Sequence, residues 1–530
     1  MRQAILRCLL LMLSGTILWG QALPVFPEYQ DRIREKNELT FIGYYLTRYE
    51  AINIAPANDF LKGQVVGRFY GGNSTESLSD AYSNYLEQRF LGMLSYSPRL
   101  FDGWARMRMS FELDWTWGDA NYGSGGNFGG AFGADFVNMQ TQNLFFEFHP
   151  NKKWYVNLGL LRFYDNTSVP YYTGTNELLT TGYRLSLFGS DASGLSAHWS
   201  PAADRHIKFG AYQLYENNVE QNDDVIVYEL DVEQDLSIKT TLGLSLHYLT
   251  DDGSSQNGGG EGGVSILGQG LNSLLSGYNG VARLNLADET YRAQVYWLGT
   301  HFDHDPMLEQ GRFGYSGFVY TTRGQVDVDS IRVSGAKQAT DGVSIAGYAG
   351  NLRLAYKYGK NPRDRIVLDG IFSTGDGDNV ADEVYSGVLT GNNWTSPGAV
   401  FFGTGLYLLL PHGDVVNRYY AATIDIQNMG FGLMAGVAQL SYDIIPYKLR
   451  VEGNLGYAAS PVAPSGGGHV LGFEKNLGVV YTPRVFFDLE LHASQLSLGD
   501  FYDSTVTNGG ITGRPADPWT VILLLKWIMF

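Results

Sequence analysis

The stretch from Trp104 to Gly118, WARMRMSFELDWTWG, alternates between apolar and polar residues. From Ala105 to Trp117 every second residue is aliphatic, sulfur-containing or aromatic, and the residues between them include four charged side chains. Successive side chains of a β-strand point to opposite faces, whereas a helix repeats about every 3.6 residues. The stretch therefore predicts a strand with one apolar and one charged face. It is longer than the roughly 5–6 residues of most soluble strands.

The same alternation recurs in four other segments, at 225–235, 351–359, 447–457 and 484–493. In a transmembrane barrel the apolar face meets lipid and the polar face lines the interior, and closure leaves no strand edge unpaired. A soluble β-sandwich or propeller would also alternate, but with shorter strands. We therefore expect an all-β fold, a transmembrane antiparallel up-and-down β-barrel.

The N-terminus predicts export. Arg2 and Arg7 flank the start of an apolar run that ends at Trp19, and residues 20–22 form a plausible cleavage site, so residues 1–22 are interpreted as a signal peptide. A retained membrane anchor is the alternative. Cys8, the only cysteine, lies in this segment. With 37 basic and 54 acidic residues, the chain is not expected to bind nucleic acid.

Short and long connections alternate along the chain, as they do in barrels with short periplasmic turns and long extracellular loops. Residues 23–62 are assigned to an N-terminal periplasmic or plug-like segment and residues 63–530 to the barrel. The segment 399–427 either adds a hairpin, which would make twenty strands, or folds into the lumen. The eighteen expected strands lie near 63–71, 85–96, 104–117, 138–149, 154–164, 193–200, 206–216, 225–236, 238–250, 278–287, 290–303, 344–358, 363–373, 431–442, 446–458, 469–481, 484–497 and 518–530.

The chain ends on the apolar run LLLKWIMF, which suits the last strand of a barrel. Its terminal aromatic, Phe530, is the kind of residue that barrel-assembly machinery recognises. Counting back by twos from Phe530 places Lys526 on the lipid face. There it would either snorkel to the periplasmic rim or be turned towards the lumen by a bulge.

A barrel of this size is too wide for side chains to fill. Rings of fixed charge along its wall can select permeant ions, or neighbouring strands can neutralise one another and merely hydrate the wall. The candidate channel-lining residues are Arg106, Arg108, Glu112, Asp114, Arg353, Lys357, Lys448, Arg450, Glu452, Arg484, Asp488 and Glu490.

Two other kinds of site were considered. Asp376 and Asp378, in the loop STGDGDNVADE, offer the oxygen ligands that calcium prefers, but the loop lacks EF-hand spacing, and an acidic turn without metal is the alternative. His247 or His492 could act as the base of an outer-membrane hydrolase, but no Ser/His/Asp set can be assembled from the sequence. We therefore expect no enzyme activity and no cofactor.

Several short motifs carry a family resemblance. TQNLFFEF, WYVNLGLLRFYD, SGLSAHWSP and FSTGDGDN follow one another from about Gln140 onward. Their order resembles large outer-membrane porins, most closely the alginate-export type with eighteen strands. In that family basic lumen residues select a polyanionic polysaccharide, which implies this role for Arg106, Arg108 and Arg162. Glu112 and Asp114 depart from a purely basic lining.

We therefore expect a channel in the bacterial outer membrane, in contact with lipid. It would pass small polar or anionic solutes, or export a polysaccharide. A non-conducting adhesion barrel that displays its loops and an outer-membrane hydrolase are the alternatives.

Overall fold

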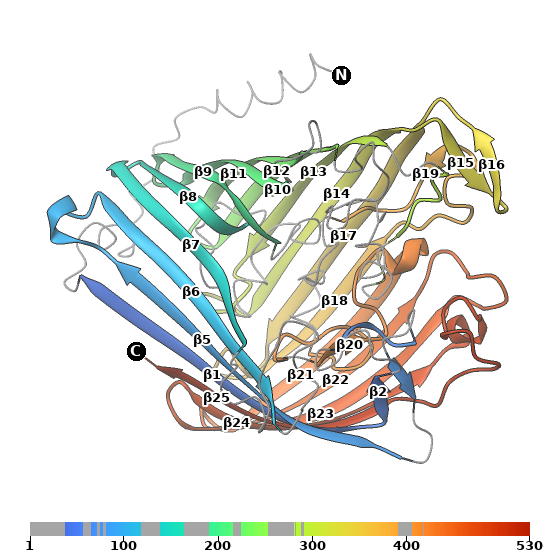
Figure 1. Ribbon diagram of the computed structural model, residues 1–530. Coiled ribbons are helices and arrows are strands. Elements are labelled where there is room, and N and C mark those ends of the chain that lie inside the picture. Colours follow the sequence, from blue (N-terminus) through green and yellow to red (C-terminus); the bar gives the residue numbers. More distant parts are fainter. Residues whose placement is uncertain are drawn as a thin grey trace.

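The structure is a computed structural model, and it describes residues 38–56, 65–70, 75–77, 81–117, 138–163, 190–215, 224–252, 280, 282–287, 291–390, 405–416 and 418–529. Within these ranges, eighteen long antiparallel strands form a closed barrel (Figure 1). Each wall strand pairs with the next along the chain, and β1 (Leu39–Ile52) pairs with β25 (Trp519–Met529) to close the wall. The predicted fold and strand count are confirmed.

The other wall strands are β5 (Ser83–Tyr96), β6 (Ala105–Thr116), β7 (Asn138–Asn151), β8 (Trp154–Phe163), β9 (Ser190–Ala202), β10 (Arg205–Tyr215), β11 (Val225–Ser237), β12 (Thr240–Asp251), β13 (Arg292–His304), β14 (Phe313–Asp327), β17 (Val343–Lys357), β18 (Arg365–Ser373), β21 (Leu433–Ile445), β22 (Leu449–Ala459), β23 (Val470–Arg484) and β24 (Phe487–Leu498). The short elements are β2 (Ile54–Pro56), β3 (Val65–Arg68), β4 (Thr75–Ser77), β15 (Ser330–Val333), β16 (Ala336–Ala339), β19 (Val384–Tyr385), β20 (Arg418–Ala421), η1 (Arg99–Phe101), η3 (Asn428–Gly430) and η4 (Asp500–Asp503).

The wall strands are apolar outside and polar inside, as the alternation predicted. In β18, Ile366 and Leu368 are exposed on the outer face while Asp369 and Ser373 are buried. An outer surface of this kind can meet lipid, and the ladder bonds satisfy the backbone within the wall. Among the described residues there is no helix whose length and apolar character would let it cross a membrane.

The barrel begins earlier than predicted. Residues 39–52, assigned to a plug-like segment, form wall strand β1, which pairs with both β25 and β5. The alternation was misread because the inner face of β1 carries Leu46 and Ile52 beside Arg48 and Glu50. The predicted first strand, 63–71, is not in the wall, since β3 pairs with β20 instead. The predicted signal peptide lies outside the described residues.

A second wall strand was also misassigned, again as an exchange of one segment for another. The segment 278–287 was predicted as a wall strand and 304–343 as a loop, but β14 within that loop pairs with β13 and β17. The inner face of β14 includes Phe318 and Tyr320, which are buried, so its inward side lacks the expected charges. The described part of 278–287 makes an isolated bridge from Leu286 to Ile331.

Candidate functional site

The long connection between β18 and β21, residues 374–432, folds back into the barrel, and we call it the inward loop. Among its described residues, Leu406, Leu408 and Leu410 are fully buried. Residues 405–416 therefore do not form the additional hairpin of a twenty-stranded wall. The alternative prediction, a loop folded into the lumen, is confirmed.

One buried carboxylate holds the middle of the inward loop against the wall. Glu474 on β23 accepts hydrogen bonds from the backbone N–H groups of Tyr407, Leu408 and Leu409, at 2.8, 3.0 and 2.6 Å. Asn476, two residues further along β23, donates to the Gly405 carbonyl at 2.8 Å. Hydrogen bonds to a charged acceptor are about twice as strong as neutral ones, so Glu474 is a strong anchor.

Other wall strands hold the loop elsewhere. The indole of Trp297 on β13 donates to the Leu389 carbonyl at 2.8 Å, and Arg89 on β5 donates to the Val416 carbonyl at 3.2 Å. Ser373 at the end of β18 donates to the Ile426 carbonyl at 2.6 Å. The loop thus contacts strands from widely separated parts of the wall, and the area around β20 in Figure 1 shows it crossing the interior.

The tip of the inward loop, Pro411–Asp414, is held by the last strand. Lys526 on β25 forms an ion pair with Asp414 and lies 3.0 Å from a carboxylate oxygen of Glu490 on β24. Arg48 on β1 donates to the Asp414 carbonyl at 3.1 Å. Because Lys526 lies three residues before the end of β25, the tip reaches nearly to the end of the barrel that carries the short turns.

Lys526 therefore faces the lumen, which is one of the two orientations that the sequence left open. The burial of β25 shows that Thr520, Ile522 and Leu524 share its inner face, while Val521 and Leu523 are exposed outside. No bulge interrupts the pairing of β25 with either neighbour. The inner residues are apolar because the inward loop packs near them. Phe530 lies outside the described residues.

His412, at the tip, is neutral. Burial lowers its pKa to about 3, and its Nδ1 accepts the backbone N–H of Asp414 at 3.1 Å. The ring stacks on Tyr407, with the ring centroids 4.2 Å apart. Burial opposes the charge of Asp414, but Lys526 lowers the pKa of that carboxyl. The tip thus joins a neutral imidazole to a charged pair.

The charges predicted on β6 are inward but paired. Arg106 and Arg108 lie 3.3 and 2.8 Å from the carboxylate of Glu147 on β7, and all three side chains are almost completely buried. Glu147 was not among the predicted residues, although the register places it opposite Arg106. This part of the wall matches the interpretation in which neighbouring strands neutralise one another.

Further along the same strand, the acidic residues pair with β5. Glu112 and Asp114 lie 2.8 and 2.7 Å from the guanidinium of Arg89. The side chain of Arg89 is 22% exposed. This cluster therefore keeps some contact with solvent, unlike the Arg106 cluster.

A third cluster combines Glu229, Asp231 and His247, whose possible ligand atoms lie within 4.8 Å of one another. The ammonium of Lys208 lies 2.8 Å from Glu229 and 3.9 Å from Asp231. The Lys208 ammonium already supplies a positive charge to both carboxylates. The cluster is therefore described as a buried ion-pair network of the wall.

The remaining predicted residues fall into three groups. Arg353 pairs with Asp369 at 3.1 Å, and Arg450 pairs with Glu452 at 3.1 Å. Three other side chains have different contacts. Lys357 donates to the Leu308 carbonyl, Asp488 accepts from Thr482, and Glu490 accepts from His492. Lys448 and Arg484 are exposed at the short-turn end. Arg162 lies on β8 opposite Asp191, and its side chain is outside the described residues.

The acidic loop has a defined local structure. Asp376 accepts hydrogen bonds from the N–H groups of Asp378 and Ser386, at 3.1 and 2.7 Å, and from the Ser386 hydroxyl at 2.7 Å. Asp378 is exposed. These hydrogen bonds account for the position of the Asp376 carboxylate without a metal ion. Calcium binding by Asp376 and Asp378 stays a prediction.

Charged side chains also connect the loop tip to the neighbouring wall. Glu452 on β22 lies 3.7 Å from one ring nitrogen of His492, and the other ring nitrogen lies 2.9 Å from Glu490. Since Glu490 also contacts Lys526, a continuous chain of charged and polar groups runs from Arg450 to Asp414. The links between strands, from Glu452 to His492 and from Glu490 to Lys526, were not predictable from strand alternation alone, because they depend on how neighbouring strands are placed.

Comparisons with known proteins give solved barrels only. No protein-family model matches the chain, and no curated protein matches it. Among similar solved structures, Acinetobacter baumannii OccAB4 is 9% identical with a TM-score of 0.46, over 92% of this chain and 98% of that one. Pseudomonas aeruginosa OpdL is 8% identical with a TM-score of 0.45, over 93% and 99%. Pseudomonas aeruginosa OpdK, solved with vanillate, is 10% identical with a TM-score of 0.45, over 92% and 98%.

Proposed function

We propose that this chain is a channel of the bacterial outer membrane for the passive passage of small polar or anionic solutes. The observation that carries the proposal is a closed barrel, apolar outside and charged inside, with one long loop folded across its interior. Eighteen strands enclose more space than wall side chains can fill. In this proposal the inward loop narrows that space, and solutes pass beside it.

The solute would meet the charged groups that keep contact with solvent. Lys526, Asp414, Arg450 and Glu452 have side chains that are 20–25% exposed. The cluster of Arg106, Arg108 and Glu147 is sealed and would act as part of the wall. Partly hydrated charges of both signs would replace water around a passing solute and favour polar over apolar molecules.

Export of a polyanionic polysaccharide, which the family resemblance implies, is a narrower form of this proposal. It would require unpaired positive charge along the passage. Because Arg106 and Arg108 are buried beside the carboxylate of Glu147, they are not accessible to a polyanion. We therefore favour small solutes and assign no chemical step to the chain.

In this proposal lipid contacts the outer apolar face, and the last strand carries the signal for barrel assembly. Liposome swelling tests the proposal with the purified full chain. Vesicles containing the barrel should swell in small neutral and anionic solutes, at rates that fall as solute size increases. Vesicles with folded protein that swell no faster than empty ones would instead favour a barrel that only displays its loops.

A further inference from the structure

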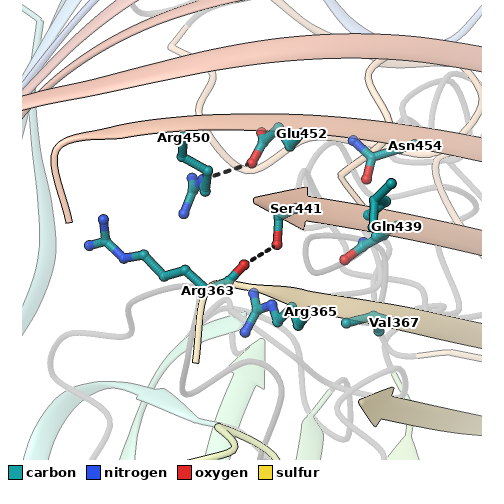
Figure 2. A pocket seen from close by; sticks show the side chains of 9 residues that line it. Arg363, Arg365, Val367, Gln439, Ser441, Arg450, Glu452 and Asn454 are labelled. Carbon is teal, nitrogen blue, oxygen red and sulfur yellow. Dashed lines mark hydrogen bonds and ion pairs between the residues drawn. The ribbon is translucent and has the colours of Figure 1, made fainter. Parts of the chain in front are cut away.

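A polar pocket opens in the barrel interior near the short-turn end (Figure 2). Its volume is about 80 Å³. A water molecule needs roughly 10–15 Å³ of such space, so the pocket has room for a small polyatomic ion. The lining side chains that matter are Arg363 in the turn before β18, Arg365 on β18, and Arg450 and Glu452 on β22.

Strand register brings these residues together. Arg365 lies opposite Ser441 on β21, and Ser441 lies opposite Glu452 on β22. The hydroxyl of Ser441 donates to the backbone carbonyl of Arg363 at 2.5 Å, which fixes the turn beside the pocket. The site is therefore built on three neighbouring wall strands and one short turn, with no contribution from the long loops.

The lining of the pocket is positively charged. It contains three guanidinium groups and one carboxylate, and that carboxylate, Glu452, is already 3.1 Å from Arg450. In the described part of the chain no carboxylate lies within 4.0 Å of the guanidinium of Arg363 or Arg365. Asp364, next to Arg363, and Asp443, near the end of β21, accept backbone N–H groups instead.

The guanidinium of Arg363 lies over an aromatic ring, with its carbon 5.4 Å from the centre of the Tyr447 ring. Such stacking leaves the edge of the guanidinium fork available for hydrogen bonds. Arg365 is half-buried on the inner face of β18. A half-buried arginine with no carboxylate within 4.0 Å is unfavourable, and a bound anion would remove that cost.

We propose that this pocket binds a small oxyanion, a carboxylate or phosphate group, between Arg363, Arg365 and Arg450. Planar guanidinium forks match the two oxygens of such groups and bind them in a bidentate way. Apart from Val367 and Leu440, the residues that line the pocket are polar, so it suits a hydrated ion better than an aromatic ring. The inference rests on the proposed function only for the route by which the anion arrives.

Calorimetric titration of the detergent-purified full chain tests the site, with sodium acetate and sodium phosphate as separate probes at low ionic strength. We expect one of the two anions to bind with a stoichiometry of one. Arg365→Gln should weaken that binding about tenfold or more, as expected for loss of a charge-assisted pair. The affinity of Arg365→Lys should lie between those of the wild type and Arg365→Gln, because lysine keeps the positive charge but lacks the forked guanidinium group.

Arg484→Gln is the matched control, since Arg484 is an exposed arginine at the same end of the barrel. It should change binding by less than about twofold. Absence of binding by the wild-type barrel, or equal weakening by both glutamine variants, would overturn the proposal. Each variant is checked for the heat-dependent gel mobility of a folded barrel. The titration measures binding and not flux. A barrel that binds the anion but does not conduct would therefore contradict the proposed function alone. A barrel that conducts but does not bind the anion would contradict this inference alone.

Discussion

Lys526 on the closing strand and Asp414 at the tip of the inward loop form an ion pair inside the barrel, although 112 positions separate them in the sequence. The pair joins the tip of a long loop to the closed wall. It also places a basic side chain of an otherwise apolar strand where it has two carboxylate partners. The position of the loop tip therefore depends on Lys526.

Lys526→Gln should loosen the loop tip, because it leaves Asp414 and Glu490 without their cation. We expect a larger or noisier single-channel current and a loss of up to about 3 kcal/mol in the free energy of unfolding, below that of a fully buried pair because Lys526 is 20% exposed. The double variant Lys526→Gln/Asp414→Asn should recover part of the loss. An unchanged current in Lys526→Gln would contradict the role of this pair.

Glu474→Gln should weaken the middle of the inward loop, because a neutral amide offers one acceptor oxygen where the carboxylate serves three N–H groups. A cost of about 1–3 kcal/mol is expected for the lost charge-assisted bonds. Amide hydrogen exchange should become faster at residues 407–409. Glu309→Gln, at an exposed glutamate of a short turn, is the control and should leave the exchange of these amides unchanged.

Ion selectivity should separate the sealed charges from the accessible ones. Arg450→Gln removes the arginine that pairs with Glu452. The reversal potential in a KCl gradient should then shift towards cation selectivity, and the permeability ratio should change by about a factor of two or more. Arg106→Gln should give a smaller shift, since that side chain is 1% exposed and is packed beside Glu147. A larger shift from Arg106 than from Arg450 would show that the passage runs along β6 instead.

Acidic pH should loosen the loop tip through His412. Burial, with the nearby cations Lys526 and Arg48, lowers the pKa of His412 to about 3, while Asp414 acts in the opposite direction. The unfolded loop binds a proton below about pH 6.5 and the docked loop does not, so docking weakens as the pH falls from about 6.5 towards 3. Single-channel noise should rise across this range.

His412→Gln is the matching variant, because an amide can still accept the Asp414 N–H but does not titrate. It should remove most of the change between pH 6.5 and 4. The ion pair of Lys526 and Asp414 should change only at lower pH, since the pKa of Asp414 is itself lowered. An equal pH response in wild type and His412→Gln would assign the effect to another group.

The sequence alone was sufficient to predict wall strands wherever charged residues line the lumen. β6 and β11 alternate because their inner faces carry charged residues such as Arg106 and Glu229. Prediction from the sequence failed at β1 and β14, where Leu46 and Phe318 face inwards. There the inner face is covered by chain folded into the barrel, so the rule that inward residues are polar does not hold.

Pairing between charges could not be predicted for a similar reason. Alternation gives the face of a residue but not its neighbour on the next strand, which depends on register. Arg108 therefore looked like a selectivity charge until its partner Glu147 was placed beside it. Among the described residues Arg365 has no such partner, whereas Arg353 does. Nothing in the sequence distinguishes the two arginines.

Planar-bilayer recording of the purified full chain tests the central claim most directly. We expect discrete, ohmic current steps from protein with the heat-dependent gel mobility of a folded barrel, and larger or noisier steps from Lys526→Gln. Folded wild-type protein that inserts into the bilayer and gives no current would contradict a channel function.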